Sequence, residues 1–301
     1  MSSNKDRSSS VKKFGILNVY KPINMTSFDV VREIRKLTNE KKVGHCGTLD
    51  PLACGVLPVC IGKATKAIDY IMDNNKEYIA TLKLGEITDT YDLEGKVIST
   101  SDVKVNEEQV IEAVNSFKGT IKQVPPMYSA LKVNGKKLYE LARQGIEVER
   151  EAREINIYEI EILNIDIPYI KIQVNCSKGT YIRSLCYDIG QKLNCGAVMT
   201  SLERIATGKF TKENSIKLED LNKENIEEYI MDIDNAFLKY PKVIANEKFK
   251  KLLLNGVVLK DDKFISKIEI MRIYRVYDEE HTLIGIGRKT EIGFKLLKVL
   301  I

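Results

Sequence analysis

Asp50 is the residue whose surroundings in the sequence point most directly to chemistry. It lies in the stretch Val43–Pro58, where Gly44, Gly47, Pro51 and Gly55 interrupt regular structure, because glycine permits positive φ and proline removes a donor. The stretch predicts one long loop without helix or strand, on which the next proline holds Asp50 extended. A loop carboxylate can serve as a nucleophile, although aspartate before proline is also a common turn opener.

The same stretch offers nitrogen and sulfur atoms that invite a zinc interpretation. Its potential ligands are His45, Cys46, Cys54 and Cys60, but this spacing matches no known zinc finger and adjacent ligands rarely reach one metal. The six cysteines include no C-x-x-C pair, and they are Cys46, Cys54, Cys60, Cys176, Cys186 and Cys195. We therefore expect free thiols and no metal.

A family resemblance gives Asp50 a role. The segment Gly44–Ala53 resembles the catalytic loop of the bacterial TruB-type tRNA pseudouridine synthases, which convert uridine 55 in the T-loop of tRNA to pseudouridine. The family usually has threonine where this chain has Cys46 and Cys54, and neither difference affects the aspartate. The resemblance implies that Asp50 is the catalytic nucleophile.

Two further motifs imply catalytic partners for Asp50. The triplet Lys76-Glu77-Tyr78 is similar to the family motif whose tyrosine stacks against the target base, so Tyr78 is expected in the active site. The segment Gly179–Leu185 is similar to the motif whose arginine, here Arg183, pairs with the catalytic aspartate. Arg183 also stands in the first turn of a predicted helix, where a cation opposes the helix dipole and should have a compensating partner.

Other residues are predicted to bind the substrate. The resemblance implies that His45 helps to occupy the space left by the flipped base, and that Tyr181 and Leu202 line the uracil pocket. Lys21, which closes a short apolar strand predicted over 14–20, belongs to the same predicted substrate-binding set. The segment Thr88–Gly95 also resembles a family motif, but by itself it is an acidic turn to which we assign no chemistry.

Local patterns predict the elements that carry these residues. Apolar alternation predicts strands over 78–84 and 170–176, and helical spacing predicts a helix capped by Thr180 that runs from Ile182 to Leu193. Capping pairs predict two more helix starts. These pairs are Thr26 with Asp29, and Asn106 with Gln109.

The distribution of charge predicts two RNA-contacting regions. Between Lys118 and Arg153 there are eight basic and four acidic residues, and the resemblance implies an inserted RNA-clasping element near residues 120–153. From Pro241 onward there are 13 Lys and Arg against 8 Asp and Glu, whereas residues 1–240 hold 34 of each. Strand patterns in this basic tail resemble the family's small β-rich PUA-type RNA-binding domain.

These observations predict an α+β protein with a pseudouridine-synthase fold, in which helices flank a mixed, mainly antiparallel central sheet. We expect a disordered extension over 1–12, a catalytic domain over 13–240 and a PUA-like domain over 241–301. The composition, with 44% hydrophobic and 30% charged residues, is typical of a soluble globular protein, and the polar N-terminus does not resemble a signal peptide. We expect a cytoplasmic monomer that binds the tRNA T-arm and needs no membrane, protein partner or cofactor.

Two other functions stay open on the sequence. A uridine methyltransferase would use a cysteine such as Cys46 as its nucleophile, but no methyl-donor motif is present. A non-catalytic factor would bind and fold tRNA without changing the uridine. For the synthase itself, attack at the ribose C1′, attack at the uracil C6 and a glycal route all remain compatible with Asp50.

Overall fold

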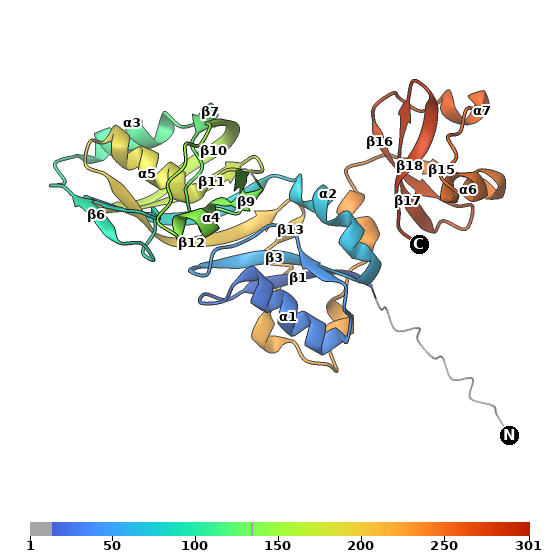
Figure 1. Ribbon diagram of the computed structural model, residues 1–301, viewed down its shortest axis with the longest axis horizontal. Helices are drawn as coiled ribbons and strands as arrows, with labels where there is room; N and C mark the ends of the chain where they lie inside the picture. The colour runs from blue at the N-terminus through green and yellow to red at the C-terminus, as the bar shows by residue number, and fades with distance from the viewer. Residues whose placement is uncertain (1–13, 134) are drawn as a thin grey trace.

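The computed structural model describes residues 14–133 and 135–301, so the prediction for residues 1–12 lies outside the described residues. The chain forms a ten-stranded sheet and a separate four-stranded sheet near the C-terminus. Figure 1 shows the small C-terminal sheet in red, beside the end of the large sheet that carries α2 (Ile68–Met72).

The large sheet is mixed and mainly antiparallel, as predicted. Its strand order is β14-β1-β3-β12-β4-β11-β10-β7, with β13 paired to β12 and β2 paired to β3. Among the described strands of this sheet, the β1–β14 and β3–β12 pairs are the parallel ones. The strands are β1 Gly15–Lys21, β2 Val43–His45, β3 Ala53–Ile61, β4 Lys76–Leu84, β7 Gly119–Gln123, β10 Arg153–Asp166, β11 Tyr169–Cys176, β12 Ala197–Thr207, β13 Phe210–Thr211 and β14 Ile216–Lys217.

Helices cover the large sheet at both ends. In Figure 1, α3 and α5 lie over the part of the sheet formed by β10 and β11, and α1 lies beside β1 and β3. The longer helices of this domain are α1 Ser27–Thr38, α3 Glu107–Asn115 and α5 Ile182–Lys192. Short elements are α4 Leu138–Ala142, η1 Gly62–Ala67, η2 Leu218–Asp220, η3 Ile226–Tyr229, η4 Ile233–Phe237, and the small strands β5 Glu86–Thr88, β6 Val97–Thr100, β8 Lys132–Val133 and β9 Lys136–Lys137.

Sequence patterns account for most of these elements. The alternation that predicted β4 and β11 appears as buried positions that alternate with partly or fully exposed ones, and the buried apolar side chains join a single core cluster. Both predicted capping boxes are present, and they begin α1 and α3. α5 begins at Ile182, as predicted, but the predicted cap was wrong by one residue. Tyr181 takes the N-cap position, and the Thr180 hydroxyl instead donates to the Ser177 carbonyl.

The prediction of one continuous loop over Val43–Pro58 was wrong. β2 and β3 occupy both ends of this stretch, and only Cys46–Leu52 remains outside them. Gly55 lies inside β3 with φ +108°, where an added Cβ would stand 2.2 Å from the Arg204 carbonyl oxygen. The glycine therefore permits close approach of the neighbouring strand β12 and does not mark a loop.

The predicted RNA-clasping element begins and ends at adjacent strands. β7 pairs with β10, so residues 124–152 leave the sheet and return to it at neighbouring positions. This segment carries α4 and a small apolar cluster of its own. Its polar groups also contact the start of α5, as described below.

The C-terminal sheet has the order β15-β16-β17-β18 and a separate core. Its elements are β15 Lys242–Ile244, α6 Glu247–Leu254, α7 Asp262–Ile265, β16 Ile273–Tyr277, β17 Leu283–Thr290 and β18 Gly293–Val299. A second apolar cluster joins Ile286 and Leu300 of this module to Phe237 and to β3, so the two sheets pack together. Within the described ranges, no helix has the length and apolar character needed to cross a membrane.

Candidate active site

The loop that carries Asp50 is anchored from two neighbouring elements. At the start of α1, the Ser27 hydroxyl accepts a hydrogen bond from the Leu49 N–H at 2.8 Å. The same hydroxyl donates to the Leu49 carbonyl oxygen at 3.1 Å. Lys21 at the end of β1 donates to the Pro51 carbonyl at 3.4 Å. These contacts fix the backbone on both sides of Asp50, although Ser27 carried no signal in the sequence.

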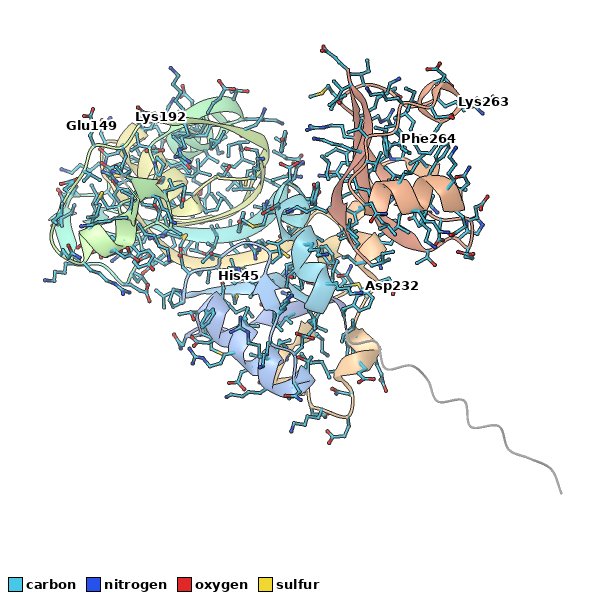
Figure 2. The ribbon with its side chains drawn as sticks, turned by 45° about the vertical axis from the view of Figure 1, so that its right-hand side comes forward. His45, Glu149, Lys192, Asp232, Lys263 and Phe264 are labelled. Carbon is cyan, nitrogen blue, oxygen red and sulfur yellow. The ribbon has the colours of Figure 1, made fainter. Side chains whose placement is uncertain are left out.

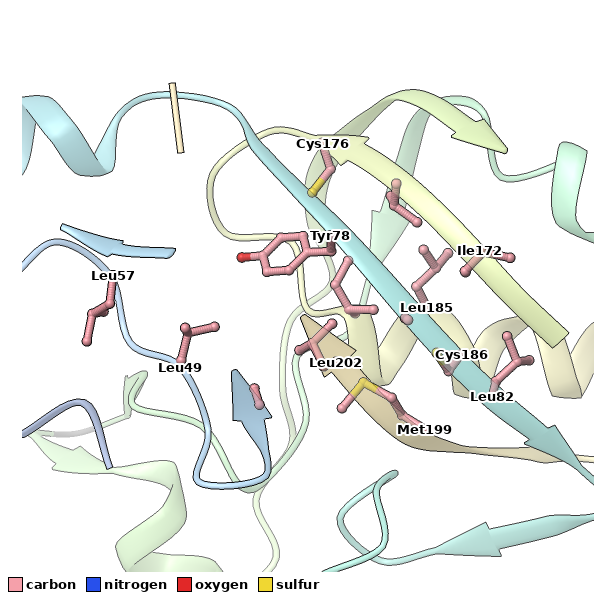
Figure 3. Packing of buried hydrophobic residues seen from close by; sticks show 14 of the residues in the cluster. Leu49, Leu57, Tyr78, Leu82, Ile172, Cys176, Leu185, Cys186, Met199 and Leu202 are labelled. Atoms are coloured by element: carbon pink, nitrogen blue, oxygen red, sulfur yellow. The ribbon is translucent and has the colours of Figure 1, made fainter. Parts of the chain in front are cut away.

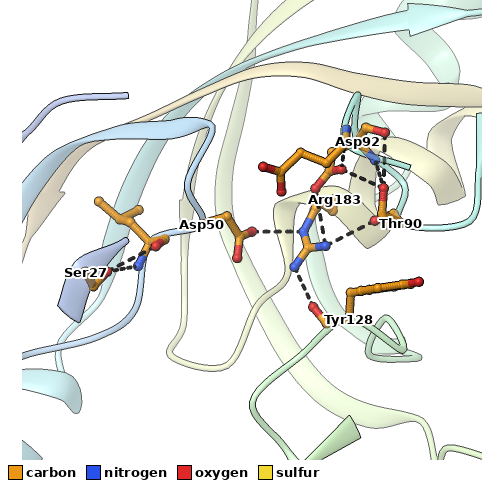
Figure 4. A network of polar contacts seen from close by, with 8 residues as sticks. Ser27, Asp50, Thr90, Asp92, Tyr128 and Arg183 are labelled. Carbon is orange, nitrogen blue, oxygen red and sulfur yellow. Dashed lines mark hydrogen bonds and ion pairs between the residues drawn. The ribbon is translucent and has the colours of Figure 1, made fainter. Parts of the chain in front are cut away.

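Arg183 and Asp50 form the ion pair that the sequence predicted. The Arg183 Nε lies 3.0 Å from the Asp50 Oδ2, and the guanidinium is almost fully buried. Its other nitrogens contact Asp92 Oδ2 at 3.3 Å, the Thr90 carbonyl at 3.1 Å and the Tyr128 carbonyl at 2.8 Å (Figure 4). The cation in the first turn of α5 therefore has the compensating partners that its position required.

Asp92 is the residue of this network that sequence reasoning missed. Its side chain is 3% exposed, and its Oδ1 accepts from the Thr90 hydroxyl at 2.6 Å and from the Glu94 N–H at 3.0 Å. It belongs to the acidic segment Thr88–Gly95, to which the sequence assigned no chemistry. A buried arginine that needs more than one partner is a signal for such a carboxylate, but only the fold joins this segment to α5.

The protonation of Asp50 reflects two opposing effects. Burial raises the pKa of Asp50 above its ordinary value, and the neighbouring Asp92 charge adds to the rise, while the Arg183 guanidinium lowers the pKa. The net direction is upward, so the attraction of Arg183 offsets the cost of burial only in part. The Asp50 side chain is nevertheless 33% exposed, which leaves the carboxylate accessible beside the buried arginine.

Tyr78 lies on β4 next to the loop. Figure 3 shows its ring directed from the strand toward Leu49, with Leu202 of β12 close by. The side chain is 8% exposed, and Asp50 is near enough for its charge to affect the Tyr78 hydroxyl. The structure therefore brings Tyr78, Leu202 and Asp50 together, as predicted, around an apolar wall with one carboxylate.

Tyr181 connects this site to the inserted segment. Its N–H donates to the Gln123 side-chain oxygen at 2.8 Å, and its carbonyl accepts from the Gln123 amide at 3.1 Å. Ser184 of the same helix donates to the Val124 carbonyl at 3.0 Å. The base of the inserted segment is thus bonded to the turn that carries Arg183, a contact that the sequence did not reveal.

His45 and Lys21 differ in how they meet solvent. His45 ends β2 (Figure 2), and burial together with the Arg204 charge lowers its pKa, so the imidazole is neutral near pH 7. Lys21 has no exposed surface, and its ammonium donates to the carbonyls of Pro22, Met25 and Pro51. Burial lowers the Lys21 pKa to about 8. In this structure Lys21 supports the loop that carries Asp50 through its hydrogen bond to the Pro51 carbonyl.

The cysteines of this region do not form a metal site or an exposed nucleophile. The Cys46 and Cys60 sulfurs lie 3.5 Å apart and are both fully buried, whereas Cys54 lies near the Tyr20 hydroxyl. Across residues 14–133 and 135–301, no group of three or more His, Cys, Asp and Glu side chains could hold a metal ion. A buried Cys46 that faces another thiol cannot reach a uracil ring, which removes the observation that favoured a methyltransferase.

Arg204 is a second buried arginine to which the sequence gave no role. It follows Leu202 on β12 and is 1% exposed. Its Nε donates to the Val56 carbonyl at 2.7 Å and its Nη2 to the Gly47 carbonyl at 3.1 Å. It therefore contacts both arms of the Asp50 loop.

Comparison with known proteins places these residues in a family. Residues 35–182 match the model of the TruB family pseudouridylate synthase N-terminal domain, and residues 183–238 match that of the tRNA pseudouridylate synthase B C-terminal domain. The chain is 58% identical to tRNA pseudouridine synthase B of Clostridium acetobutylicum over 286 residues, which cover 95% of this chain and 99% of the relative. It is 46% identical to the protein of the same name from Alkaliphilus oremlandii, with coverage of 95% and 97%.

Solved structures show the same fold. The crystal structure of a Cbf5-Nop10-Gar1 complex contains a chain that matches with a TM-score of 0.75 and 29% identity, covering 96% of this chain and 85% of that one. The structure of an H/ACA RNP bound to a substrate RNA containing 2′-deoxyuridine matches with a TM-score of 0.72 and 26% identity, with coverage of 96% and 86%. Both domain models match, the sequence identity to the relatives extends over nearly the full length, and the fold is shared. This chain therefore belongs to the TruB family of pseudouridylate synthases.

Proposed function

We propose that this chain isomerises uridine 55 in the T-loop of tRNA to pseudouridine. The observation that carries the proposal is the Asp50–Arg183 pair at 3.0 Å, which sets an accessible carboxylate beside a buried guanidinium and an apolar wall. Its near full-length relatives named tRNA pseudouridine synthase B support tRNA as the substrate. The reaction breaks an N–C bond and makes a C–C bond on one sugar without redox change, so no cofactor is required.

The proposed mechanism begins with extrusion of the target base, because an enzyme cannot reach a base inside a stacked loop. Tyr78 stacks on the flipped uracil, and Tyr181 and Leu202 form the pocket wall. His45 occupies the space that the base leaves, and its neutral ring suits this role. Lys21 acts as a positioning residue, since its ammonium supports the loop through the Pro51 carbonyl.

Asp50 then acts as the nucleophile that allows the glycosidic bond to break, and Arg183 holds its carboxylate in position. After the uracil has rotated and rejoined the sugar through C5, the C5 proton must leave. In the proposed step the C5–H bond breaks, its electron pair forms the C5=C6 double bond, and N1 takes a proton from solvent. Tyr78 first loses its own hydroxyl proton to solvent, and the resulting phenolate oxygen then takes the C5 proton as the base.

The inserted segment over 124–152 and the C-terminal module are the proposed RNA-binding parts. The basic surplus from Pro241 onward suits contact with phosphates. The inserted segment is bonded to α5, because its Val124 carbonyl accepts from the Ser184 hydroxyl. We assign the catalytic domain to 13–240 and a PUA-like domain to 241–301. The proposed enzyme works as a cytoplasmic monomer, with tRNA as its only required partner.

The test is pseudouridine formation in a tRNA transcript, measured by chemical labelling of pseudouridine at each position. The wild type should modify uridine 55 of the T-loop, and Asp50→Asn should lower the rate by about 10³-fold or more while tRNA affinity remains. A wild type that binds tRNA and leaves every uridine unchanged would instead favour the non-catalytic folding factor. Residual Asp50→Asn turnover above a few per cent would remove Asp50 from the nucleophile's role.

A further inference from the structure

Arg204 is an unusual feature of the core because it is a buried cation that faces carbonyl groups rather than carboxylates. Within residues 14–133 and 135–301, no Asp or Glu oxygen lies within 4.0 Å of its guanidinium nitrogens. An arginine stays protonated throughout the working range of enzymes, and an unpaired buried charge is costly. Its hydrogen bonds to two carbonyls satisfy donors without neutralising the charge, so the position of the cation itself calls for an explanation.

The two carbonyls identify one role. Gly47 follows β2 and Val56 lies within β3, so Arg204 joins the two arms of the loop that carries Asp50. The backbone of Arg204 contributes as well, because it pairs in parallel with Gly55. A single buried side chain thus sets the separation of the arms between which Asp50 is presented.

The neighbour of Arg204 on the other strand identifies a second role. In the antiparallel β12–β4 pair, Arg204 lies opposite Tyr78, and both side chains point into the core. The Arg204 charge is close enough to the Tyr78 hydroxyl to lower its pKa. Cation and phenol are therefore adjacent on the same face of the sheet, inside a largely dry site.

From this arrangement we propose that Arg204 is a positioning residue for the reaction: it holds the Asp50 loop and stabilises the ionised Tyr78 hydroxyl that takes the C5 proton. The inference rests on the proposed function, since only that reaction needs a base at this place. A fixed cation in a low-dielectric site favours an oxyanion without reorganisation at the moment of reaction. This role explains why Arg204 bonds to carbonyls and not to a carboxylate, because an arginine already paired with a carboxylate would stabilise the phenolate less.

The charges around Tyr78 agree with this assignment. Burial raises the Tyr78 pKa, and the Cys176 thiol on β11 and Asp50 add to the rise, while the Arg204 charge lowers it. The same cation lowers the pKa of His45 and of Lys76, in addition to the effect of their burial. The Arg204 charge thus acts on Tyr78, His45 and Lys76, and at Tyr78 it opposes the rise in pKa that burial causes.

The first experiment titrates Tyr78 directly. With 3-fluorotyrosine placed at position 78 of the full chain, the fluorine resonance is followed against pH in the wild type and in Arg204→Gln. We expect the pKa of residue 78 to rise by about one unit without the cation, a tenfold loss of phenolate. Because this readout needs no turnover, it remains informative even if the wild type fails to make pseudouridine, an outcome that would count against the proposed function alone.

The second experiment is a double-mutant cycle on the single-turnover rate, using Arg204→Lys and Tyr78→Phe. Lysine keeps the charge but loses the fork, so it also serves if the glutamine variant does not fold. We expect Arg204→Lys to slow the wild type about tenfold and to slow Tyr78→Phe much less, because the two residues act in one step. Equal slowing in both backgrounds, with an unmoved fluorotyrosine titration, would overturn the role in ionising Tyr78.

Arg35→Lys is the matched control. Arg35 donates to the Val43 carbonyl at 3.1 Å, at the start of β2 and away from Asp50. Replacing it removes an arginine–carbonyl bond of the same kind without touching Tyr78. It should leave the fluorotyrosine titration and the single-turnover rate unchanged, and a matching loss in this variant would show that the Arg204 effect reflects general loosening.

Discussion

Asp92 and Asp50 contact the same Arg183 guanidinium from different sides, at 3.3 Å and 3.0 Å (Figure 4). Two carboxylates on one guanidinium leave the group with a net negative charge. Asp92 is the buried member of the pair, and Asp50 is the accessible one. Asp92 therefore orients the guanidinium from its buried side, while the Arg183 Nε remains directed at Asp50.

The first prediction concerns Asp92. In Asp92→Asn, the side-chain amide can take two orientations. In one, its nitrogen faces the Arg183 donors, and in the other it replaces the oxygen that accepts from Thr90 and Glu94, so those bonds are broken. We expect the single-turnover rate to fall about 10²-fold with tRNA affinity unchanged, because the guanidinium loses its fixed orientation. Asp89→Asn on the same loop is the control, since Asp89 accepts from the Lys96 N–H and does not contact Arg183. Equal rates for Asp92→Asn and wild type would contradict the orienting role.

Arg183→Lys tests the fork itself. Three guanidinium nitrogens of Arg183 contact Asp50, Asp92 and the Tyr128 carbonyl, whereas a lysine presents one nitrogen that cannot span these positions. The expected result is a fall in single-turnover rate of about 10²-fold or more, although the positive charge is kept. A lysine variant with normal activity would show that charge alone is sufficient.

Asp50 also makes a prediction about stability and pH. Its pKa is raised in the folded state, so the stability that it contributes is present below the unfolded pKa and is lost as pH rises through the folded pKa. Asp50→Asn cannot ionise and should gain stability relative to wild type as pH rises from about 4 through the raised pKa of the wild-type carboxyl, in urea unfolding experiments. The rate of the wild type should fall on acidification through the same window, because the carboxylate becomes protonated. A stability difference that shrinks with rising pH would contradict the raised pKa.

Tyr78 separates stacking from proton transfer. Tyr78→Phe keeps the ring and should preserve tRNA affinity, whereas Tyr78→Leu should cost about 1–3 kcal/mol of stacking. If the hydroxyl is the base, Tyr78→Phe should cleave the glycosidic bond and then stall before product release. Single-turnover product formation at the wild-type rate in Tyr78→Phe would leave Tyr78 with stacking alone.

The C-terminal module is tested through its charge. Glutamine at its exposed lysines should weaken tRNA binding and lower the slope of affinity against salt by about one unit for each phosphate that the module no longer neutralises, while turnover on saturating tRNA persists. The lysines are Lys242, Lys248, Lys251, Lys260, Lys263, Lys267, Lys295 and Lys298. Neutralising exposed carboxylates of the same module is the control and should not reduce affinity. An unchanged salt slope would mean that the module does not touch RNA.

The sequence by itself determined the local elements and the central pair of residues. Alternation predicted β4 and β11, capping pairs predicted the starts of α1 and α3, and all of these predictions were confirmed. These features depend on side chains within a few residues of one another, so they are legible in a linear pattern. The need of Arg183 for a partner followed in the same way from its place in the first turn of α5.

Only the tertiary structure decided what stands around that pair. Asp92, Gln123 and Arg204 act through contacts with residues 58 to 157 positions away in the chain, and no periodicity carries such information. Gly55 shows the same limit, because its type predicts a break in regular structure and yet it lies in a strand. Position 55 has no room for a Cβ because the Arg204 backbone lies against it on the neighbouring strand. That close approach arises only once the sheet has formed.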